Sequence, residues 1–312
     1  MIKSKSKYNL VSIVGPTAGG KTAFAARLAR ELNGEIISAD SRQVYRRMNI
    51  GTGKDYNDYV VDGRQIPFHV VDIVEPGYKY SVFEYQQDFI KAFQSVLKKG
   101  KMPVLCGGTG MYIEAVIKGY KLLPVPPDDE FRKNLQEKTL DGLIRILSGY
   151  KKLHNVSDID TKERVIRAIE IEAYYADHPG TERKYPDIHP LLIGIRFERE
   201  EQRRRITRRL NERLGNGMVE EVQSLLNEGI PPGDLIYYGL EYKYITQYLA
   251  GELEYDEMVN RLNIAIHQFA KRQMTWFRKM EKEGTVIHWL DGELPDRVKV
   301  ERSIRIITGK QD

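Results

Sequence analysis

Short apolar runs alternate with helical patterns over the first third of the chain. Tyr8 to Val14 is rich in β-forming residues, and a helical pattern follows a glycine-rich turn, from Lys21 to Leu32. Four further segments continue the alternation: Glu35 to Ser38, Phe68 to Ile73, the helical stretch Val82 to Lys99, and Met102 to Cys106. Alternating strands and helices are typical of a parallel sheet covered on both faces. The pattern predicts a doubly wound α/β core.

The pattern changes after Ile117. The segment KLLPVPPDDE is rich in proline and acidic residues, and beyond it Phe131 to Leu147 and Lys162 to Tyr175 show only helical periodicity. A strand-like run, LLIGIRF, follows Pro190, and the rest is mostly helical, including Tyr255 to Lys282. We therefore predict three segments: a first part of the core over 1–121, a helical insertion domain over 122–188, and the remainder of the core, mostly helical, over 189–312.

Composition narrows the class of protein. Hydrophobic residues make up 41% of the 312 residues and charged residues 30%, as in globular proteins. No apolar run reaches the roughly 18 residues that a membrane span requires, and Leu10 to Val14 is too short for a signal peptide. Cys106 is the only cysteine, which excludes an internal disulfide and a cysteine metal cluster and fits a reducing compartment. We expect a cytoplasmic monomer without a membrane partner, and the net charge of +5 permits a polyanionic one.

A phosphate-binding motif lies between the first strand and the first helix. It matches G-x-x-x-x-G-K-[ST], and its residues are Gly15, Pro16, Thr17, Ala18, Gly19, Gly20, Lys21 and Thr22. Glycines let backbone N–H groups surround phosphate oxygens, and the helix N-terminus adds partial positive charge. Lys21 is expected to neutralise phosphate charge and Thr22 to hold Mg²⁺. The predicted fold is therefore a P-loop NTPase-like core with an inserted all-helical domain; the loop by itself does not specify the reaction.

Two further turns follow predicted strands. Asp40 comes after the strand Ile36 to Ser38, at the carboxyl end of a sheet strand, where open α/β sheets bind their ligands. The sequence Gly107 to Gly110 contains Thr109 and opens another helix, so it offers small residues and one hydroxyl group to a ligand. Each has a plainer interpretation, since Asp40 could cap a helix and the glycines could form a tight turn.

Several longer segments carry a family resemblance. GPTAGGKT, ISADSRQVYRRMNIGTGK, HVVDIVEPGYKYSVFEYQQD, PVLCGGTGMYIEAV, ERVIRAIEI and KRQMTWFRK occur in the order of the signature segments of the bacterial tRNA dimethylallyltransferases. The chain resembles that family from Val11 to about Lys282. The resemblance implies a core like that of P-loop kinases, a helical insertion that grips the anticodon stem-loop, and transfer of dimethylallyl to N6 of adenosine 37 in tRNAs that read codons starting with U.

The resemblance assigns roles to the motif residues. An exocyclic adenine amine is a poor nucleophile, so a base must accept its proton, and Asp40 matches the base of the family. The phosphate loop and Mg²⁺ would stabilise the departing diphosphate of dimethylallyl diphosphate, and Thr109 would contact the acceptor nucleotide. Arg205 and Arg209 lie four residues apart, so they share a helical face and could meet one diphosphate. The alternative is a solvated basic face that neighbouring glutamates balance.

Residues for tRNA follow from the same resemblance and from the chemistry of single-stranded loops. The predicted set is Asp40, Ser41, Arg42, Gln43, Thr109, Glu163, Arg164, Val165, Ile166, Arg167, Lys271 and Arg272. For Trp276 and Phe277, nearby aromatic residues, core packing is the preferred interpretation over base stacking. Two departures from the family pattern affect fine contacts, namely Asp160-Thr161 in place of Asn-Asp and His267 where arginine is common.

Three other functions are compatible with parts of the sequence. An adenylate isopentenyltransferase would prenylate a free nucleotide and would need no tRNA-gripping insertion. A small-molecule kinase could use Asp40 to activate a hydroxyl group toward ATP. A nucleotide switch or RNA-binding module would bind phosphate without turnover.

Overall fold

The computed structural model describes residues 7–151, 161–178 and 185–309. The chain divides into two compact units, a core of Met1–Tyr120 with Pro186–Asp312 and a helical unit of Lys121–Tyr185. The insertion was predicted over residues 122–188, and the helical unit spans residues 121–185. Among the described residues, no helix is long and apolar enough to cross a bilayer.

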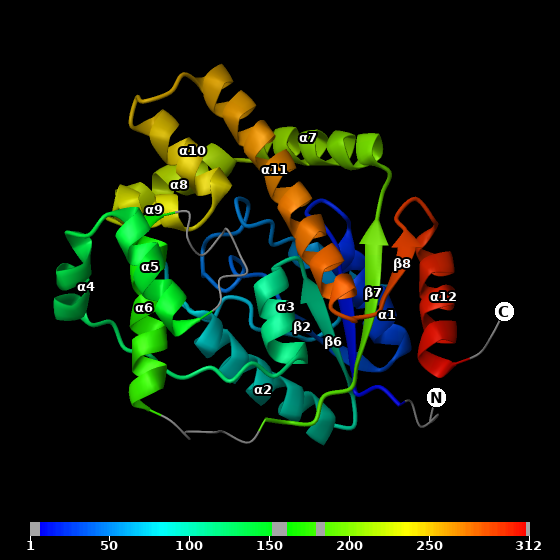
Figure 1. The fold of residues 1–312 in the computed structure, drawn as a ribbon. Helices are drawn as coiled ribbons and strands as arrows, with labels where there is room; N and C mark the ends of the chain where they lie inside the picture. The colour runs from blue at the N-terminus through cyan, green and yellow to red at the C-terminus, as the bar shows by residue number, and fades with distance from the viewer. Residues whose placement is uncertain (1–6, 152–160, 179–184, 310–312) are drawn as a thin grey trace. The chain divides into compact units, whose positions relative to one another are not determined.

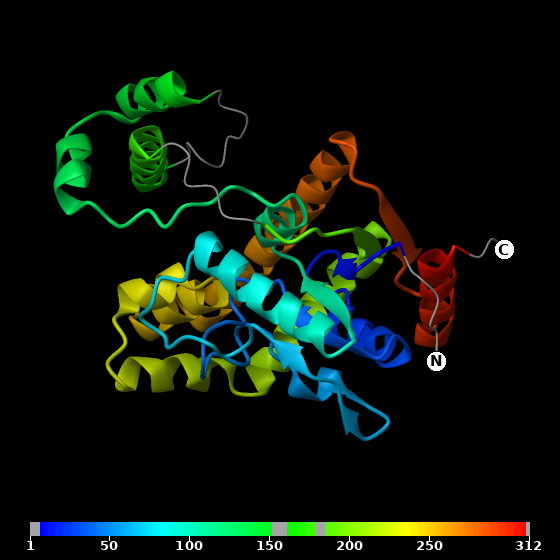
Figure 2. The ribbon, with the colours of Figure 1, turned by 90° about the horizontal axis from the view of Figure 1, so that it is seen from below.

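The core is built on a six-stranded parallel sheet of order β5-β2-β6-β1-β7-β8 (Figure 1). Its strands are β1 (Leu10–Val14), β2 (Gly34–Ser38), β5 (Phe68–His69), β6 (Met102–Gly107), β7 (Pro190–Arg196) and β8 (Ile287–Asp291). A separate antiparallel hairpin of β3 (Val60–Val61) and β4 (Arg64–Gln65) extends away from the sheet in Figure 2. The parallel sheet confirms the predicted α/β class.

The core also contains helices, some of which cover the two faces of the sheet. They are α1 (Lys21–Glu31), the 3₁₀ helix η1 (Tyr56–Tyr59), α2 (Val82–Lys98), α3 (Gly110–Ile117), α7 (Arg199–Gly215), α8 (Met218–Asn227), α9 (Pro232–Tyr237), α10 (Leu240–Leu249), α11 (Tyr255–Lys282) and α12 (Asp296–Thr308). Successive strand residues point to opposite faces, so Val11 and Ile13 pack toward α1 and α12. Leu10 and Val14 pack instead in the cluster that includes α2, α3 and α11. The doubly wound arrangement places the carboxyl ends of the central strands at one edge, where the candidate site lies.

Two predicted elements differ from the structure, and one observed strand was not predicted. The strand Phe68–Ile73 ends at His69, because Val70 and Asp72 have φ of 61° and 54°, which no extended strand accommodates. The single pattern Phe131–Leu147 belongs to two helices, and the second begins where Thr139 accepts the Gly142 N–H at 3.2 Å. The edge strand β8 was not predicted.

The helical unit contains α4 (Asp129–Gln136), α5 (Leu140–Tyr150) and α6 (Lys162–Asp177). Leu143, Leu147 and Val165 are fully buried in its own small core. Glu170 of α6 is almost fully buried and accepts hydrogen bonds from Arg132 Nε at 3.0 Å and from Arg167. Burial acts to raise the pKa of Glu170, but hydrogen bonds from Arg132 and Arg167 lower it below its ordinary value. This buried ion cluster joins α4 to α6.

Candidate active site

The phosphate loop connects β1 to α1 and depends on glycine at two positions. Gly15 has φ of 147°, and a Cβ atom there would meet the Ile195 carbonyl oxygen at 2.4 Å. Gly20 is in the left-handed region with φ of 68° and forms the N-cap of α1. The loop therefore passes close to β7 and then turns sharply into the helix, which directs backbone N–H groups toward a bound anion.

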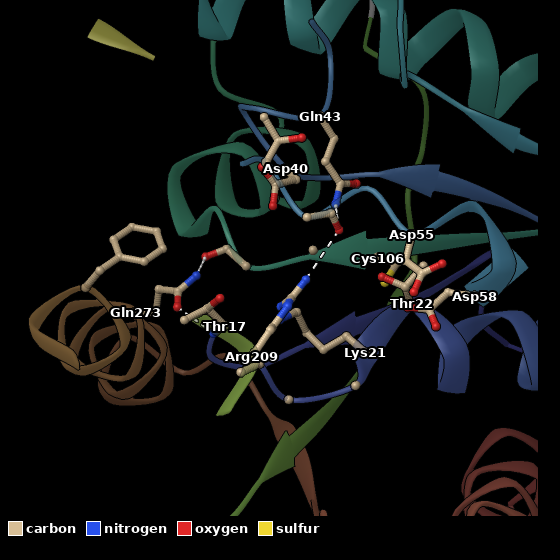
Figure 3. Close-up of a pocket in the computed structure, with 18 of the residues that line it drawn as sticks. Thr17, Lys21, Thr22, Asp40, Gln43, Asp55, Asp58, Cys106, Arg209 and Gln273 are labelled. Carbon is tan, nitrogen blue, oxygen red and sulfur yellow. Dashed lines mark hydrogen bonds between the residues drawn. The ribbon is translucent and has the colours of Figure 1, made fainter. Parts of the chain in front are cut away.

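A glutamine of α11 holds this loop. Gln273 Oε1 accepts the backbone N–H of Thr17 at 2.8 Å, and Gln273 Nε2 donates to the carbonyl oxygen of Gly108 at 2.9 Å (Figure 3). One buried amide thus joins the phosphate loop to the Gly107–Gly110 turn. This role of Gln273 was not predicted from the sequence. It depends on two hydrogen bonds to backbone groups far away in the sequence, and such contacts leave no spacing pattern.

Helix α7 grips the same loop from its other side. Gln202 Nε2 donates to the Thr17 carbonyl oxygen at 2.7 Å, and Arg205 Nε donates to the Ala18 carbonyl oxygen at 3.0 Å. The Arg205 guanidinium lies 4.3 Å from the centroid of the Phe197 ring. Thr17 is therefore hydrogen-bonded through both backbone groups, and the loop conformation is set before any ligand binds.

A cavity of about 220 Å³ opens beside the loop. Residues Thr17 to Thr22 line it together with Asp40, Gln43 and Arg209 (Figure 3). One cavity of the core therefore brings Asp40 and Arg209 together with most of the predicted phosphate loop, whereas Gly15, Pro16, Thr109 and Arg205 are not among its lining residues. Four further lining residues from the segment after β2 were not predicted, namely Thr52, Gly53, Asp55 and Asp58.

Asp40 lies at the carboxyl end of β2, in a turn that its own side chain stabilises. Asp40 Oδ1 accepts the Arg42 N–H at 2.9 Å, and the Ser41 N–H donates to Thr109 Oγ1 at 3.1 Å. The Thr109 backbone N–H in turn donates to the Ala39 carbonyl oxygen at 3.2 Å. These bonds join the turns after β2 and β6, so Asp40 and Thr109, far apart in sequence, belong to one local structure.

Arg209 brings a buried cation into the cavity. Its Nη2 donates to the Gly53 carbonyl oxygen at 3.3 Å, and Gln43 Nε2 reaches the same oxygen at 3.4 Å. Burial, reinforced by the charge of Arg213, lowers the pKa of Arg209 to about 10. The guanidinium therefore stays charged at neutral pH. Arg213, one turn further along α7, was not predicted and lies 3.7 Å from Glu241.

Lys21 is a second buried cation of the cavity. Its Nζ donates to the Pro16 carbonyl oxygen at 2.7 Å, and burial lowers its pKa from 10.5 to about 8. A lysine that bonds only a neutral carbonyl of its own loop keeps its charge for an incoming anion.

The donor atoms of the cavity suit Mg²⁺. The Thr22 hydroxyl and the Asp40, Asp55 and Asp58 carboxylates are hard oxygen ligands. Among the described residues, no three or more His, Cys, Asp or Glu side chains form a metal-binding group. Mg²⁺ is commonly held by one or two protein oxygens together with substrate phosphates.

The residues predicted to bind tRNA differ in exposure. Lys271, Arg272, Glu163 and Arg164 are exposed, and Ser41, Arg42 and Gln43 are half-buried. Two members of the set point inward, since Val165 and Ile166 belong to the core of the helical unit. Their side chains are therefore unavailable to a partner. They were included in the predicted set because they lie within the segment Glu163 to Arg167.

Arg167 is engaged within the helical unit. It bonds Glu170 and donates through Nη2 to the Val125 carbonyl oxygen at 2.9 Å. A structural role therefore accounts for Arg167 without tRNA.

The remaining flagged residues have mostly structural surroundings. Phe277 is fully buried, and the ring of Trp276 packs partly buried against the same core and close to Gly110, in keeping with core packing. His267 Nε2 lies 3.3 Å from Thr207 Oγ1, and burial, with the charge of Arg203, lowers its pKa. Thr161 caps α6 by accepting the Arg164 N–H, whereas Asp160 lies outside the described residues.

The fold and the loop define an α/β protein with a P-loop-like core and a cavity beside the loop, at the carboxyl edge of its sheet. Residues 43–280 match the family model described as IPP transferase. A tRNA dimethylallyltransferase 2 of Bacteroides fragilis is 61% identical over 293 residues, which cover 94% of this chain and 96% of that protein.

Solved structures agree with this match. The tRNA isopentenylpyrophosphate transferase of Bacillus halodurans is 31% identical with a TM-score of 0.71, and the match covers 97% of each chain. A eukaryotic dimethylallyltransferase acting on tRNA has a TM-score of 0.77 at 20% identity over 97% of this chain and 81% of that one, a likeness of fold. The chain belongs to the IPP transferase family and is an enzyme of that family.

Proposed function

We propose that this protein transfers the dimethylallyl group of dimethylallyl diphosphate to N6 of adenosine 37 in the anticodon loop of tRNAs that read codons starting with U. The observation that carries the proposal is the shared cavity, in which Asp40 lies opposite a phosphate loop with two buried cations. The substrates are proposed from those of its relatives, a tRNA dimethylallyltransferase and a tRNA isopentenylpyrophosphate transferase.

The chemistry assigns the two sides of the cavity different tasks. On the donor side, Lys21, Arg209 and the loop N–H groups bind the diphosphate and stabilise the charge that grows on its oxygens as the allylic C–O bond breaks. On the acceptor side, Asp40 accepts a proton from the N6 amine as its nitrogen forms the new C–N bond. Diphosphate leaves and the base keeps the proton, so atoms and charge balance. Mg²⁺, held by Thr22, would add charge neutralisation at the leaving group.

Several residues support this geometry without touching the reacting atoms. Gln273 fixes the phosphate loop relative to the Gly107–Gly110 turn, and Thr109 fixes the turn that carries Asp40. We assign Thr109 to the acceptor side for the same reason. Positioning of this kind keeps donor and acceptor in a reactive arrangement.

The helical unit is proposed to grip the anticodon stem-loop, chiefly through the exposed Arg164, and Lys271, Arg272 and Arg42 are proposed to contact RNA from the core. Extracting the adenine from the loop costs a few kcal/mol, and such contacts would offset that cost. We further propose a monomer that works in the cytoplasm.

The test is incubation of the full-length protein with labelled dimethylallyl diphosphate, Mg²⁺ and unmodified tRNA, in parallel with AMP and without ATP. Labelled tRNA is the expected product, and its digestion would locate the modified adenosine. Efficient labelling of AMP but not tRNA would favour an adenylate isopentenyltransferase. A requirement for ATP with no prenyl transfer would favour a kinase.

A substitution then tests the base. Asp40→Asn should reduce turnover by about 10²-fold or more with tRNA affinity nearly unchanged, because the amide keeps the shape and loses the basicity. Turnover within a few-fold of the parent would contradict the assignment of Asp40.

A further inference from the structure

Two cations lie close to one exposed aromatic ring of the core. Tyr237, at the end of α9, is 47% exposed. The Arg42 guanidinium carbon lies 5.4 Å from the centroid of its ring, and Lys79 Nζ lies 5.9 Å from it. The three residues come from three separate segments of the chain, so only the fold assembles this group.

The position of the Tyr237 ring is fixed by its neighbour in sequence, Tyr238. Tyr238, next in sequence, is 1% exposed and packs 4.4 Å from the Tyr45 ring, centroid to centroid. Its hydroxyl accepts the Gly77 N–H at 2.5 Å and donates to the Tyr78 carbonyl oxygen at 3.2 Å. The Tyr237 ring meets Tyr238 edge-on at 5.7 Å. An exposed ring whose backbone segment is rigidly held loses little conformational freedom when a partner stacks on it.

The charges of the two cations are available to a ligand. Among the described residues, neither Arg42 nor Lys79 forms an ion pair with a carboxylate. Their neighbours differ, since Arg46 pairs with Glu75 at 2.9 Å and Arg47 pairs with Glu75 and Glu228. Between Arg42 and Arg47, the arginine that lies over Tyr237 is thus the one without a carboxylate partner among the described residues.

This group adjoins the acceptor side of the cavity. The Arg42 backbone N–H donates to Asp40 Oδ1 at 2.9 Å, and Asp40 lines the cavity. A ligand that delivers an adenine to Asp40 would therefore bring its flanking nucleotides toward Tyr237. A rigid aromatic face with two free cations matches an unstacked base and its phosphates.

We propose that Tyr237, Arg42 and Lys79 form a stacking platform for a base that flanks the target adenine in a single-stranded RNA loop. The inference rests on the proposed function, because it takes RNA as the acceptor. Tyr237 supplies the stacking face, and the cations pair with the phosphates on either side. The platform holds the neighbouring nucleotide while the target base leaves the stack.

The experiment uses the full-length protein and an unmodified anticodon stem-loop with 2-aminopurine beside the target adenine. Binding should quench the fluorophore through stacking on Tyr237. Tyr237→Ala should weaken RNA binding about tenfold or more and lose the quench, whereas Tyr237→Phe keeps both. Lys79→Ala should weaken binding a few-fold and reduce the salt slope by about one unit.

Controls separate this platform from a general effect on folding. Tyr78→Ala removes a comparably exposed tyrosine, 49% exposed, and Arg46→Ala removes a carboxylate-paired arginine; both should bind RNA like the parent. Donor affinity, measured with an unreactive dimethylallyl diphosphate analogue, should be unchanged in every variant. Parent-like RNA affinity and quench in Tyr237→Ala would overturn the platform. Prenylation of tRNA by the parent protein is measured first, so failure of the proposed function would be seen separately.

Discussion

The cations of the core cavity and those of the helical unit look alike in sequence and differ in structure. Arg205 and Arg209 lie four residues apart on α7, and Arg164 and Arg167 lie three apart on α6. In the core, Arg205 and Arg209 donate to backbone carbonyl oxygens. In the helical unit, Arg167 shares the buried carboxylate of Glu170 with Arg132.

The difference teaches what helical spacing can and cannot reveal. Spacing identifies residues on one face of a helix, but it does not show whether a charge is already neutralised. A cation that bonds only neutral oxygens remains available to a ligand. Because such a cation is also desolvated, its pKa is lowered. A cation locked to a buried carboxylate contributes to the fold instead.

The largest effect is expected at Arg209. Arg209→Ala removes a buried charge that faces the proposed diphosphate, so donor affinity and turnover together should fall by about 10²-fold or more. Arg208→Ala is the matched control, because Arg208 is the next residue on α7, is exposed and lies 3.8 Å from Glu212. Steady-state kinetics with varied dimethylallyl diphosphate would measure both. Equal effects in the two variants would remove the distinction between available and solvated cations.

Lys21 tests the same distinction through pH. Its free-enzyme pKa of about 8 means that the ammonium is present below pH 8 and is lost above it. Binding of a diphosphate above that pH must therefore take up a proton, and the dissociation constant should rise about tenfold per pH unit from pH 8 toward 10. Calorimetric titration with an unreactive donor analogue would measure it. A flat profile would contradict the assignment to Lys21, and the same rise in Lys21→Arg would show that another group titrates.

Arg167 should behave as a structural residue. Arg167→Ala leaves Glu170 buried with only Arg132 as its side-chain cation, so the helical unit should lose about 1–3 kcal/mol of stability. Hydrogen exchange of α6 amides in the full-length protein would report this loss, whereas donor affinity in the core should not change. If exchange in α6 stays as in the parent protein, the ion cluster is not what stabilises the unit.

The smallest effect is expected at Arg164. Arg164→Ala should weaken tRNA binding a few-fold and reduce the salt slope by about one unit if the lost contact is to a phosphate. Arg145→Ala, an exposed arginine on α5, is the control within the same unit. tRNA affinity measured against salt concentration decides the matter. A slope equal to that of the parent protein would exclude a phosphate contact at Arg164.

The sheet was predictable because its strands carry a strong local signal. β1, β2, β6 and β7 are short apolar runs followed by turn residues, and α11 was predicted with its observed bounds, Tyr255–Lys282. β8 escaped notice because Ile287–Asp291 includes the half-buried His288 and Trp289, so its pattern lacks a continuous apolar run. The split between α4 and α5 depends on one capping threonine inside a continuous helical pattern.

The candidate site was predictable only in part. The phosphate loop and Asp40 have local signatures, a glycine spacing and a place at a strand end. Gln273 and Gln202 bond backbone groups that lie far away in sequence, and the Gly53 carbonyl oxygen accepts a hydrogen bond from the distant Arg209 side chain. Such contacts exist only in the folded chain, and amide side chains occur on many exposed helices, so their residue types alone predict nothing.

The order of the strands also has a consequence for synthesis of the chain. β1 lies between β6 and β7, and Val11 pairs with Val104 on one side and Leu191 on the other. All of α4, α5 and α6 lies between these two partners in sequence. During translation β1 must therefore wait for its second neighbour until the helical unit has left the ribosome, whereas that unit can fold early through local contacts. The strand that carries the phosphate loop is consequently completed late, and the nascent core exposes an unpaired edge until then.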